Sequence, residues 1–385
     1  MKLDGIRVLD LSRFLPGPWI GLTMADHGAE VIKIESHEGE PTRKLGPKVG
    51  GHTPYFRNTQ RGKLSMTLDL KSDEGREIFM KLAETSDVII DSFRPGVMDR
   101  LGLGYEAIKA RAPRIVFCSL SAFGQSGPIS QRPSHDVGAQ AMTGVLSLGR
   151  YEGRAPSLPT MPMADIALAS GALIAILMAL LRRETTGKGD CIDMAMGDAL
   201  MSWTPHILGT VVAEDRAPVL ADERLHGGAA FYNVYRTSDD KYVVLSGSEM
   251  NFVTTLLTAL GRPDLIELCK KPAGEAQAPV RKFLEETFLT KTRDEWDHWM
   301  QDKSVCFAPV LDLKEAWNSS VLRDRGMIVK GPDGVDALAT PIKFKEEPGQ
   351  PSFALPGQGE HTDMLLERLG YDADARAKLH TAKIC

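Results

Sequence analysis

The chain has 385 residues, of which 43% are hydrophobic, so it holds enough apolar material to bury two cores. Its formal net charge of −5 argues against a general nucleic-acid binder, because that role requires a basic surface that displaces counterions from phosphates. This charge is still compatible with local basic sites for a small anionic ligand.

Strand and helix signals alternate through the first half of the chain. Short β-branched runs at residues 6–11, 30–34, 88–91 and 114–118 predict strands, and helix-like stretches at 17–27 and 73–83 lie between them. The alternation predicts a parallel sheet with helices on both faces. Helices are expected next at 139–148 and 166–183, with a glycine stop at Gly187, and then a short strand at 191–194.

The pattern changes from about residue 227. Residues 230–237 and 241–245 flank Ser238-Asp239-Asp240 and predict a hairpin, and mostly helical patterns follow at 252–301. We therefore expect a large α/β domain at 1–200, completed by 341–385, and a smaller α+β domain at 227–330. Residues 201–226 and 331–340 are expected as linkers. The last amphipathic stretch covers residues 362–382.

The cysteines and apolar runs predict a cellular location. The five cysteines lack the paired spacing of a zinc site or a disulfide framework and predict free thiols in a reducing compartment. The N-terminus has no signal-peptide core, and the longest uncharged apolar run, 166–181, is shorter than the ~20 residues that span a bilayer. We expect a cytoplasmic protein without a membrane partner and interpret this run as a buried helix.

Two clusters of ionisable residues stand beside apolar helical stretches, Ser134-His135-Asp136 and Ala164-Asp165-Ile166. A histidine and a carboxylate that enter apolar surroundings must be paired or functional, because removing a charge from water is costly. The clusters are therefore candidates for proton transfer or nucleophilic catalysis. Two simpler interpretations stay open: Asp165 as a helix N-cap, and His135 as a loop histidine beside Pro133.

Motifs spread over nearly the whole chain add a family resemblance. They are Val8-Leu9-Asp10-Leu11-Ser12, Pro16-Gly17-Pro18, the run at 28–35, Arg61-Gly62-Lys63, Leu68-Asp69-Leu70-Lys71, Ser92-Phe93-Arg94-Pro95-Gly96, Leu101-Gly102, the runs at 123–128 and 186–193, Tyr235-Arg236-Thr237 and Gly359-Glu360-His361-Thr362. In this order and spacing the motifs resemble the class III CoA-transferase (CaiB/BaiF) family, which includes α-methylacyl-CoA racemases.

The resemblance implies a fold and an assembly. Each protomer is expected to form an open ring from a Rossmann-like large domain, long linkers and a small domain. Two such rings interlace as a homodimer. The substrate is expected to be an acyl-CoA thioester, with coenzyme A as part of the substrate and no metal or other cofactor.

The racemase branch implies two bases on opposite faces of the thioester α-carbon, and the matching residues are His135, Asp136 and Asp165. One base removes the α-proton and the other returns a proton to the opposite face. Glu249 aligns with a glutamate that supports the histidine, because a carboxylate partner orients an imidazole and raises its pKa. Glu249 is also compatible with a cap on the helix that begins near Met250.

The transferase branch gives Asp165 a different task. Its carboxylate attacks the acyl-CoA carbonyl, and CoA passes through an aspartyl thioester to an acceptor acid. Many transferases carry an aromatic residue at the position of His135, and the glycine-rich loop of some members is not evident at Gly247-Ser248-Glu249-Met250. These differences, with the segment 306–310, favour racemase-type epimerisation of a 2-methylacyl-CoA-like thioester. CoA transfer is the alternative.

Basic residues near the carboxyl ends of the strands are expected to bind the CoA phosphates. Arg94 follows a predicted strand and matches a CoA-contacting position of the family. Lys71 and Arg43 are further candidates, although each is also compatible with a solvated surface charge. NAD binding is disfavoured because Gly17 is the single glycine where a dinucleotide fingerprint has three. A non-catalytic acyl-CoA-binding subunit gives no reason to carry both His135 and Asp165.

Overall fold

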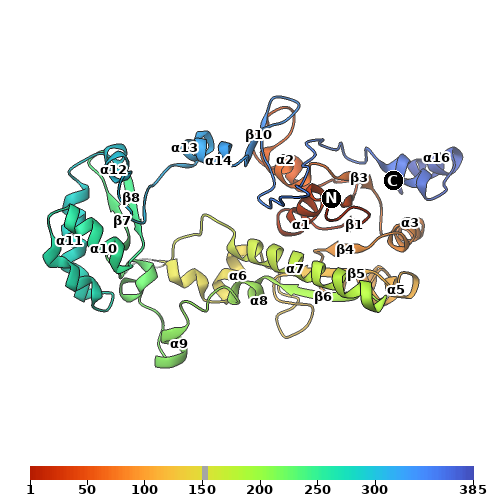
Figure 1. Cartoon of the computed structure of the whole chain (residues 1–385). Helices are drawn as coiled ribbons and strands as arrows, with labels where there is room; N and C mark the ends of the chain where they lie inside the picture. The colour runs from red at the N-terminus through yellow and green to blue at the C-terminus, as the bar shows by residue number, and fades with distance from the viewer. Residues whose placement is uncertain (150–154) are drawn as a thin grey trace. The chain divides into compact units, whose positions relative to one another are not determined.

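The computed structural model describes residues 1–149 and 155–385, which form two compact units (Figure 1). The first unit contains Met1–Trp203 and Ser320–Cys385, and the second contains Thr204–Ser319. Two segments differ from the expected boundaries. Residues 204–226, expected as a linker, contain short helices and belong to the second unit. Residues 320–340, expected as part of the small domain and a linker, belong to the first unit, where Asp333 forms an ion pair with Arg57.

The first unit is built on one six-stranded parallel sheet of order β3-β2-β1-β4-β5-β6. Its strands are β1 (Arg7–Asp10), β2 (Glu30–Glu35), β3 (Leu64–Thr67), β4 (Val88–Asp91), β5 (Val116–Ser121) and β6 (Asp190–Ala195). This is the Rossmann strand order, so the predicted parallel α/β sheet is confirmed. The sequence analysis missed β3, whose four residues Leu-Ser-Met-Thr give little strand signal.

Helices cover both faces of the sheet. One face packs against α1 (Pro16–Asp26) and α7 (Met163–Thr186). The other packs against α3 (Asp73–Glu84), α5 (Tyr105–Arg111), α15 (Thr362–Arg368) and α16 (Ala373–Thr381). Successive residues of a strand point to opposite faces, so Val8 belongs to the first core and Leu9 to the second. Both are fully buried.

Shorter elements connect these layers. They are α2 (Pro54–Gln60), α4 (Val97–Arg100), α6 (Asp136–Met142), α8 (Met196–Met201), α14 (Ser320–Asp324), the hairpin β10 (Ile328–Lys330) and β11 (Asp336–Leu338), and the 3₁₀ helices η1 (Pro41–Arg43) and η2 (Val145–Gly149). The helix expected at 139–148 is therefore divided into α6 and η2. The break falls at Gly144, whose φ of 79° leaves the helical region.

Helix α7 is buried on one face only, which differs from the expectation of a buried helix. It packs on α1 and the sheet through a stripe formed by Leu168, Ala172, Ile176 and Leu180. An opposite apolar stripe is exposed, formed by Ile174, Leu177, Met178 and Leu181. Among the described residues α7 alone is long and apolar enough to cross a membrane by length and composition, a criterion that core helices also meet. Gly187 ends the helix in the left-handed conformation, as predicted.

The second unit combines a small sheet with helices. The predicted hairpin is present as antiparallel β7 (Tyr232–Arg236) and β8 (Tyr242–Ser246), and β9 (Phe307–Pro309) pairs with β8. Its helices are α9 (Gly209–Glu214), α10 (Met250–Ala259), α11 (Ala278–Phe288), α12 (Arg293–Met300) and α13 (Leu313–Asn318), with 3₁₀ helices η3 (Leu220–Asp222), η4 (Arg224–His226), η5 (Pro263–Lys270) and η6 (Glu275–Gln277). Tyr235, Phe288 and Trp296 lie in its core.

A buried ionic cluster fixes the loop between β1 and α1. Asp10 is fully buried, and its carboxylate lies 2.9 Å from Lys63 Nζ and 3.5 Å from Lys33 Nζ. Burial alone would raise the pKa of Asp10, but the two lysines hold this pKa well below its ordinary range. Lys33 also donates to the carbonyl of Ser12. A Cβ at Gly17 would overlap Ser12, so glycine is required where α1 begins.

We predict that Asp10→Ala destabilises the first unit by about 3–5 kcal/mol, because it leaves two buried ammonium groups without their shared counter-charge. Urea unfolding of the full chain, followed by circular dichroism, measures the change. Glu77→Gln is the control, since it removes an exposed ion pair with Arg111 and should leave the midpoint nearly unchanged. If the Asp10→Ala variant unfolded at the same urea concentration as the wild type, the prediction would be contradicted.

Candidate active site

One pocket of about 460 Å³ in the first unit brings together several of the predicted site residues. We call it the His135 pocket. It opens at the carboxyl ends of β4 and β5, the edge where open α/β sheets bind ligands. Arg94, His135 and Asp165 all line it, together with Arg13, Phe14, Pro16, Ser92, Phe93, Pro95, Leu120, Ser121, Ala122, Ser130, Arg132, Pro133, Ser134, Leu168 and Met196.

Asp165 is half-buried in the first turn of α7. Burial, with a smaller contribution from the nearby charge of Asp136, raises the pKa of this carboxyl to about 6. The N-cap of α7 is Pro162, so the interpretation of Asp165 as an N-cap is wrong. A carboxyl with a raised pKa that faces a pocket is suited to proton transfer near neutral pH.

Asp136 acts on Asp165 through the backbone. It is buried, and its Oδ1 accepts hydrogen bonds from the N–H groups of Ala164 (2.7 Å) and Asp165 (3.2 Å). Its Oδ2 accepts from Gln140 Nε2 at 2.7 Å. Because Pro162 offers no side-chain cap, the Asp136 carboxylate satisfies the free N–H groups at the start of α7. It therefore fixes the helix that carries Asp165.

His135 is exposed, which corrects the expectation that the whole cluster is buried. It is the N-cap residue of α6 and has an extended backbone. Its ring meets the ring of Phe14 edge to face, with centroids 6.2 Å apart and planes at 85°. Phe14 has a φ of 65°, a left-handed conformation that is unusual for a bulky side chain. The sequence gives no signal for this conformation, so the contact between Phe14 and His135 was not predicted.

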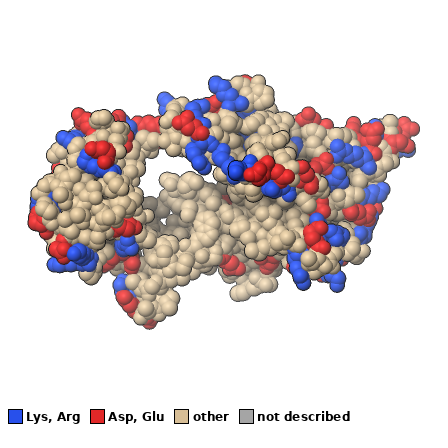
Figure 2. Space-filling view, in the orientation of Figure 1, with Lys and Arg blue, Asp and Glu red and all other residues tan. Residues whose placement is uncertain are grey.

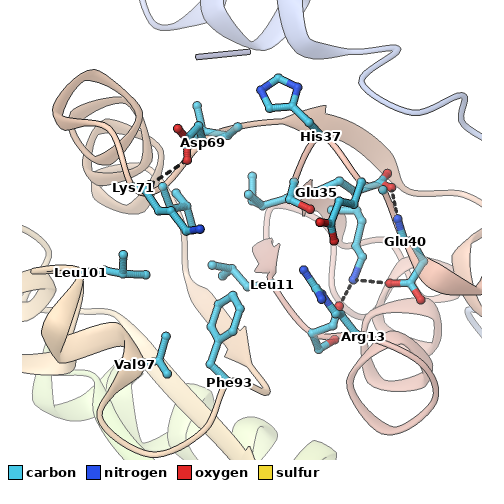
Figure 3. Close-up of a pocket in the computed structure, with 18 residues that line it drawn as sticks. Leu11, Arg13, Glu35, His37, Glu40, Asp69, Lys71, Phe93, Val97 and Leu101 are labelled. Carbon is cyan, nitrogen blue, oxygen red and sulfur yellow. Dashed lines mark hydrogen bonds and ion pairs between the residues drawn. The ribbon is translucent and has the colours of Figure 1, made fainter. Parts of the chain in front are cut away.

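A second pocket of about 490 Å³ lies beside the first (Figure 3). We call it the Lys71 pocket. It is lined by Lys71, His37 and Glu40, and it shares Arg13 and Phe93 with the His135 pocket. In Figure 3, Lys71 and Leu101 lie on the opposite side of this pocket from Arg13 and Glu40. The two pockets are therefore neighbours along the same edge of the sheet.

Arg94 and Lys71 are both exposed. The loop that carries Arg94 is fixed by the buried Asp91, which accepts a hydrogen bond from Phe93 N–H at 2.6 Å. Burial raises the pKa of Asp91 to about 6. Within residues 1–149 and 155–385, neither Arg94 nor Lys71 has a carboxylate within ion-pair distance. Both cations are thus available to an anionic ligand.

Arg43 lies outside the linings of both pockets. Its guanidinium lies 2.6 and 3.0 Å from the Glu35 carboxylate oxygens, donates to the carbonyl of Pro356 at 2.8 Å and stacks on Phe56. These contacts tie β2 to the start of α2 and to the C-terminal segment. A role in CoA binding stays a prediction, and it would require these contacts to break.

Glu249 belongs to the second unit and is exposed at the N-cap of α10. Its side chain makes no cap hydrogen bond, so the capping interpretation is not observed. Gly247 lies close to Glu249 and to Cys306, and a Cβ at this position would approach the Cys306 sulfur to 2.8 Å. That Glu249 supports His135 stays a prediction.

Tyr55 on α2 is a further polar residue that the sequence analysis missed. It is half-buried, and burial, together with smaller contributions from the charges of Asp165 and Glu40, raises the pKa of its hydroxyl to about 12. Its phenol is therefore protonated near the Asp165 carboxylate. A lone tyrosine in a short helix carries no sequence signal that would place it near the Asp165 carboxylate.

The fold and the His135 pocket define a Rossmann-type α/β protein with a histidine and a carboxyl facing one cavity. The family model described as CoA-transferase family III matches residues 3–362, so the chain belongs to this family. The human "Alpha-methylacyl-CoA racemase" is 33% identical, covering 100% of this chain and 97% of that protein. The human "Succinyl-CoA:glutarate CoA-transferase" is 31% identical, covering 99% of this chain and 89% of that protein.

A solved structure supports the same assignment. A CaiB/BaiF family protein from Brucella suis superposes with a TM-score of 0.83 at 33% identity, covering 95% of this chain and 99% of that chain. The chain is therefore an enzyme of the acyl-CoA racemase and CoA-transferase class. Within the described residues no group of three or more His, Cys, Asp or Glu side chains is placed to hold a metal ion.

We predict that Asp136→Asn lowers the pKa of Asp165 from about 6 but leaves it above the ordinary 3.8, because burial is the larger cause and remains. A ¹³C carboxyl titration of Asp165 measures the shift, and Asp73→Asn at an exposed site is the control. The folded chain binds this proton more tightly than the unfolded chain. Ionisation of Asp165 therefore reduces stability as the pH rises from 3.8 to about 6. An unchanged pKa in Asp136→Asn would exclude the electrostatic coupling.

Proposed function

We propose that the chain epimerises the α-carbon of a 2-methylacyl-CoA-like thioester by two-base proton transfer. The observation that supports this proposal is the approach of His135 and Asp165, from different helices, to one pocket. A raised pKa of about 6 leaves Asp165 ionised at neutral pH yet basic enough to take a proton.

In the proposed reaction one base takes the α-proton, and the electron pair of the C–H bond moves to the thioester carbonyl as an enolate forms. The other base then returns a proton to the opposite face of the planar carbon. His135 and Asp165 exchange these tasks between the two enantiomers. Asp136 holds the first turn of α7 in place, and Glu249 is proposed to orient His135.

The substrate is proposed to extend along the edge of the sheet, with its nucleotide end in the Lys71 pocket and its acyl end in the His135 pocket. Lys71 and Arg94 supply cations for the phosphates, since no carboxylate of the described residues pairs with either of them. Arg13 and Phe93 line both pockets and so lie along the path between them. Coenzyme A is then part of the substrate, and we propose no metal and no other cofactor.

CoA transfer is the second candidate, and a specific feature of the His135 pocket favours it. Three arginines line this pocket, Arg13, Arg94 and Arg132, and such a positive lining suits the binding of an acceptor carboxylate. In this reaction the Asp165 carboxylate attacks the acyl-CoA carbonyl, and CoA passes through an aspartyl thioester to the acceptor acid. The similarity to a human succinyl-CoA:glutarate CoA-transferase is in line with this alternative.

We predict that the protein, incubated in D₂O with one enantiomer of a 2-methylacyl-CoA, incorporates deuterium at the α-carbon without moving CoA. His135→Ala and Asp165→Ala should each lower this exchange by about 10²–10⁴-fold, the usual contribution of a positioned acid or base. Mass spectrometry and chiral analysis of the released acid measure exchange and inversion. His380→Ala is the histidine control, because the side chain of His380 is exposed on α16 and lines neither pocket.

The competing reaction is tested in parallel with acyl-CoA and free carboxylic acids. If CoA appears on the acid and a thioester on Asp165 can be trapped, the reaction is CoA transfer and not epimerisation. In that case Asp165→Ala abolishes activity and His135→Ala does not. Full racemisation by His135→Ala would remove His135 as the second base.

We further propose that two copies of the chain interlace as a homodimer in the cytoplasm. The exposed stripe of α7 supports self-association, since Ile174, Leu177, Met178 and Leu181 present an apolar helix face to solvent. Figure 2 shows few charged residues on the surface around α6 and the first half of α7. All five cysteines are free thiols, which suits a reducing compartment.

We predict that the double variant Met178→Glu, Leu181→Glu shifts the protein from dimer to monomer, because two charges would be buried in the contact. Light scattering after size-exclusion chromatography measures the mass. Val321→Glu changes another exposed residue and should leave the mass unchanged. A dimeric double variant would exclude this helix face as the contact.

A further inference from the structure

We propose that Glu40 is a positioning residue which, through Phe14, couples occupation of the Lys71 pocket to the alignment of His135. This inference rests on the proposed function. It concerns neither of the two bases. It concerns Glu40 and Phe14, to which no task has been assigned so far.

Glu40 lines the Lys71 pocket, yet its side chain is completely shielded from solvent (Figure 3). Its Oε1 accepts hydrogen bonds from Phe14 N–H at 3.2 Å and from the hydroxyl of Thr42 at 3.1 Å. Its Oε2 accepts no hydrogen bond from the described residues and is balanced by the Lys33 ammonium at 3.4 Å. Burying a carboxylate costs free energy even when it is paired, which points to a task for Glu40 beyond its ion pair with Lys33.

The bond to Phe14 N–H provides that task. Phe14 has a left-handed backbone with a φ of 65°, which costs free energy for a bulky residue unless its surroundings hold it. Glu40 accepts from the N–H of this residue, and Lys33 holds the carbonyl of Ser12 two residues earlier. The loop is therefore held from both sides. Its conformation places the Phe14 ring edge to face against His135.

The segment that carries Glu40 also lines the pocket proposed for the nucleotide end of the substrate. Residues 36–40 line the Lys71 pocket, and Glu40 N–H donates to Glu35 Oε2 at 2.7 Å. A ligand that presses on this segment changes the position of Glu40, and through Phe14 it changes the orientation of the His135 ring. The charges of Glu40 and Asp165 both act on the Tyr55 hydroxyl and raise its pKa.

The consequence is kinetic. Binding energy from a remote part of a substrate raises kcat when it aligns groups at the reacting carbon. A full acyl-CoA fills both pockets, whereas an acyl-pantetheine lacks the nucleotide end. The wild-type protein should therefore turn over acyl-pantetheine with a lower kcat, beyond any rise in KM.

The test compares α-deuterium exchange of 2-methylacyl-CoA and 2-methylacyl-pantetheine in the wild type and two variants. Glu40→Ala removes the acceptor of the Phe14 N–H bond and the charge that balances Lys33, and Phe14→Leu removes the ring that meets His135. Each variant should lower kcat for acyl-CoA by about tenfold, with KM nearly constant and less than a twofold effect on acyl-pantetheine. Phe344→Leu is the matched control, since Phe344 is 41% exposed, Phe14 is 38% exposed, and Phe344 lines neither pocket.

The outcomes separate the two proposals. Equal losses on both thioesters would mean that Glu40 and Phe14 only stabilise the fold, and would overturn the coupling. Wild-type kcat values in Phe14→Leu would overturn it as well, and this variant is informative even if Glu40→Ala fails to fold. No exchange by the wild type with either thioester would overturn the proposed epimerisation, and the coupling with it.

Discussion

The arrangement of the first unit depends on one buried carboxylate shared by two lysines. Asp10 ends the central strand β1, and Lys33 and Lys63 reach it from β2 and from the segment before β3. Charges this deep are stable only when they are paired and hydrogen-bonded. The cluster therefore specifies how the β1–α1 loop leaves the sheet, and this loop contributes Arg13 and Phe14 to the pockets.

A second carboxylate acts in the same way further along the chain. Asp136 begins α6 and satisfies the first free N–H groups of α7, so two helices meet at the residues expected to carry the chemistry. His135 and Asp165 are 30 positions apart in the sequence. Their approach rests on this cross-helix cap and on the edge of the sheet, which brings the ends of β4 and β5 to the same place.

The sequence predicted the periodic features well and the contact-dependent features poorly. Five strands of the sheet and the hairpin followed from β-branched runs and turn residues, while β3 was missed because Leu64–Thr67 is short and half polar. Family motifs led to His135 and Asp165, whose shared pocket depends on tertiary contacts. Arg43 was considered as a phosphate ligand or a solvated surface charge, and its pairing with Glu35 comes from packing. The backbone of Phe14 and the surroundings of Tyr55 leave no trace in local composition.

The discontinuous first unit also bears on how the chain folds as it is synthesised. Leu365 and Leu366 of α15 belong to the same core as Leu9 and Ile89, yet more than a hundred intervening residues form the second unit. On the ribosome, the second unit emerges in full before α15 does. Until then the sheet face that α15 and α16 cover stays partly exposed beside α3 and α5, and chaperones are expected to bind it.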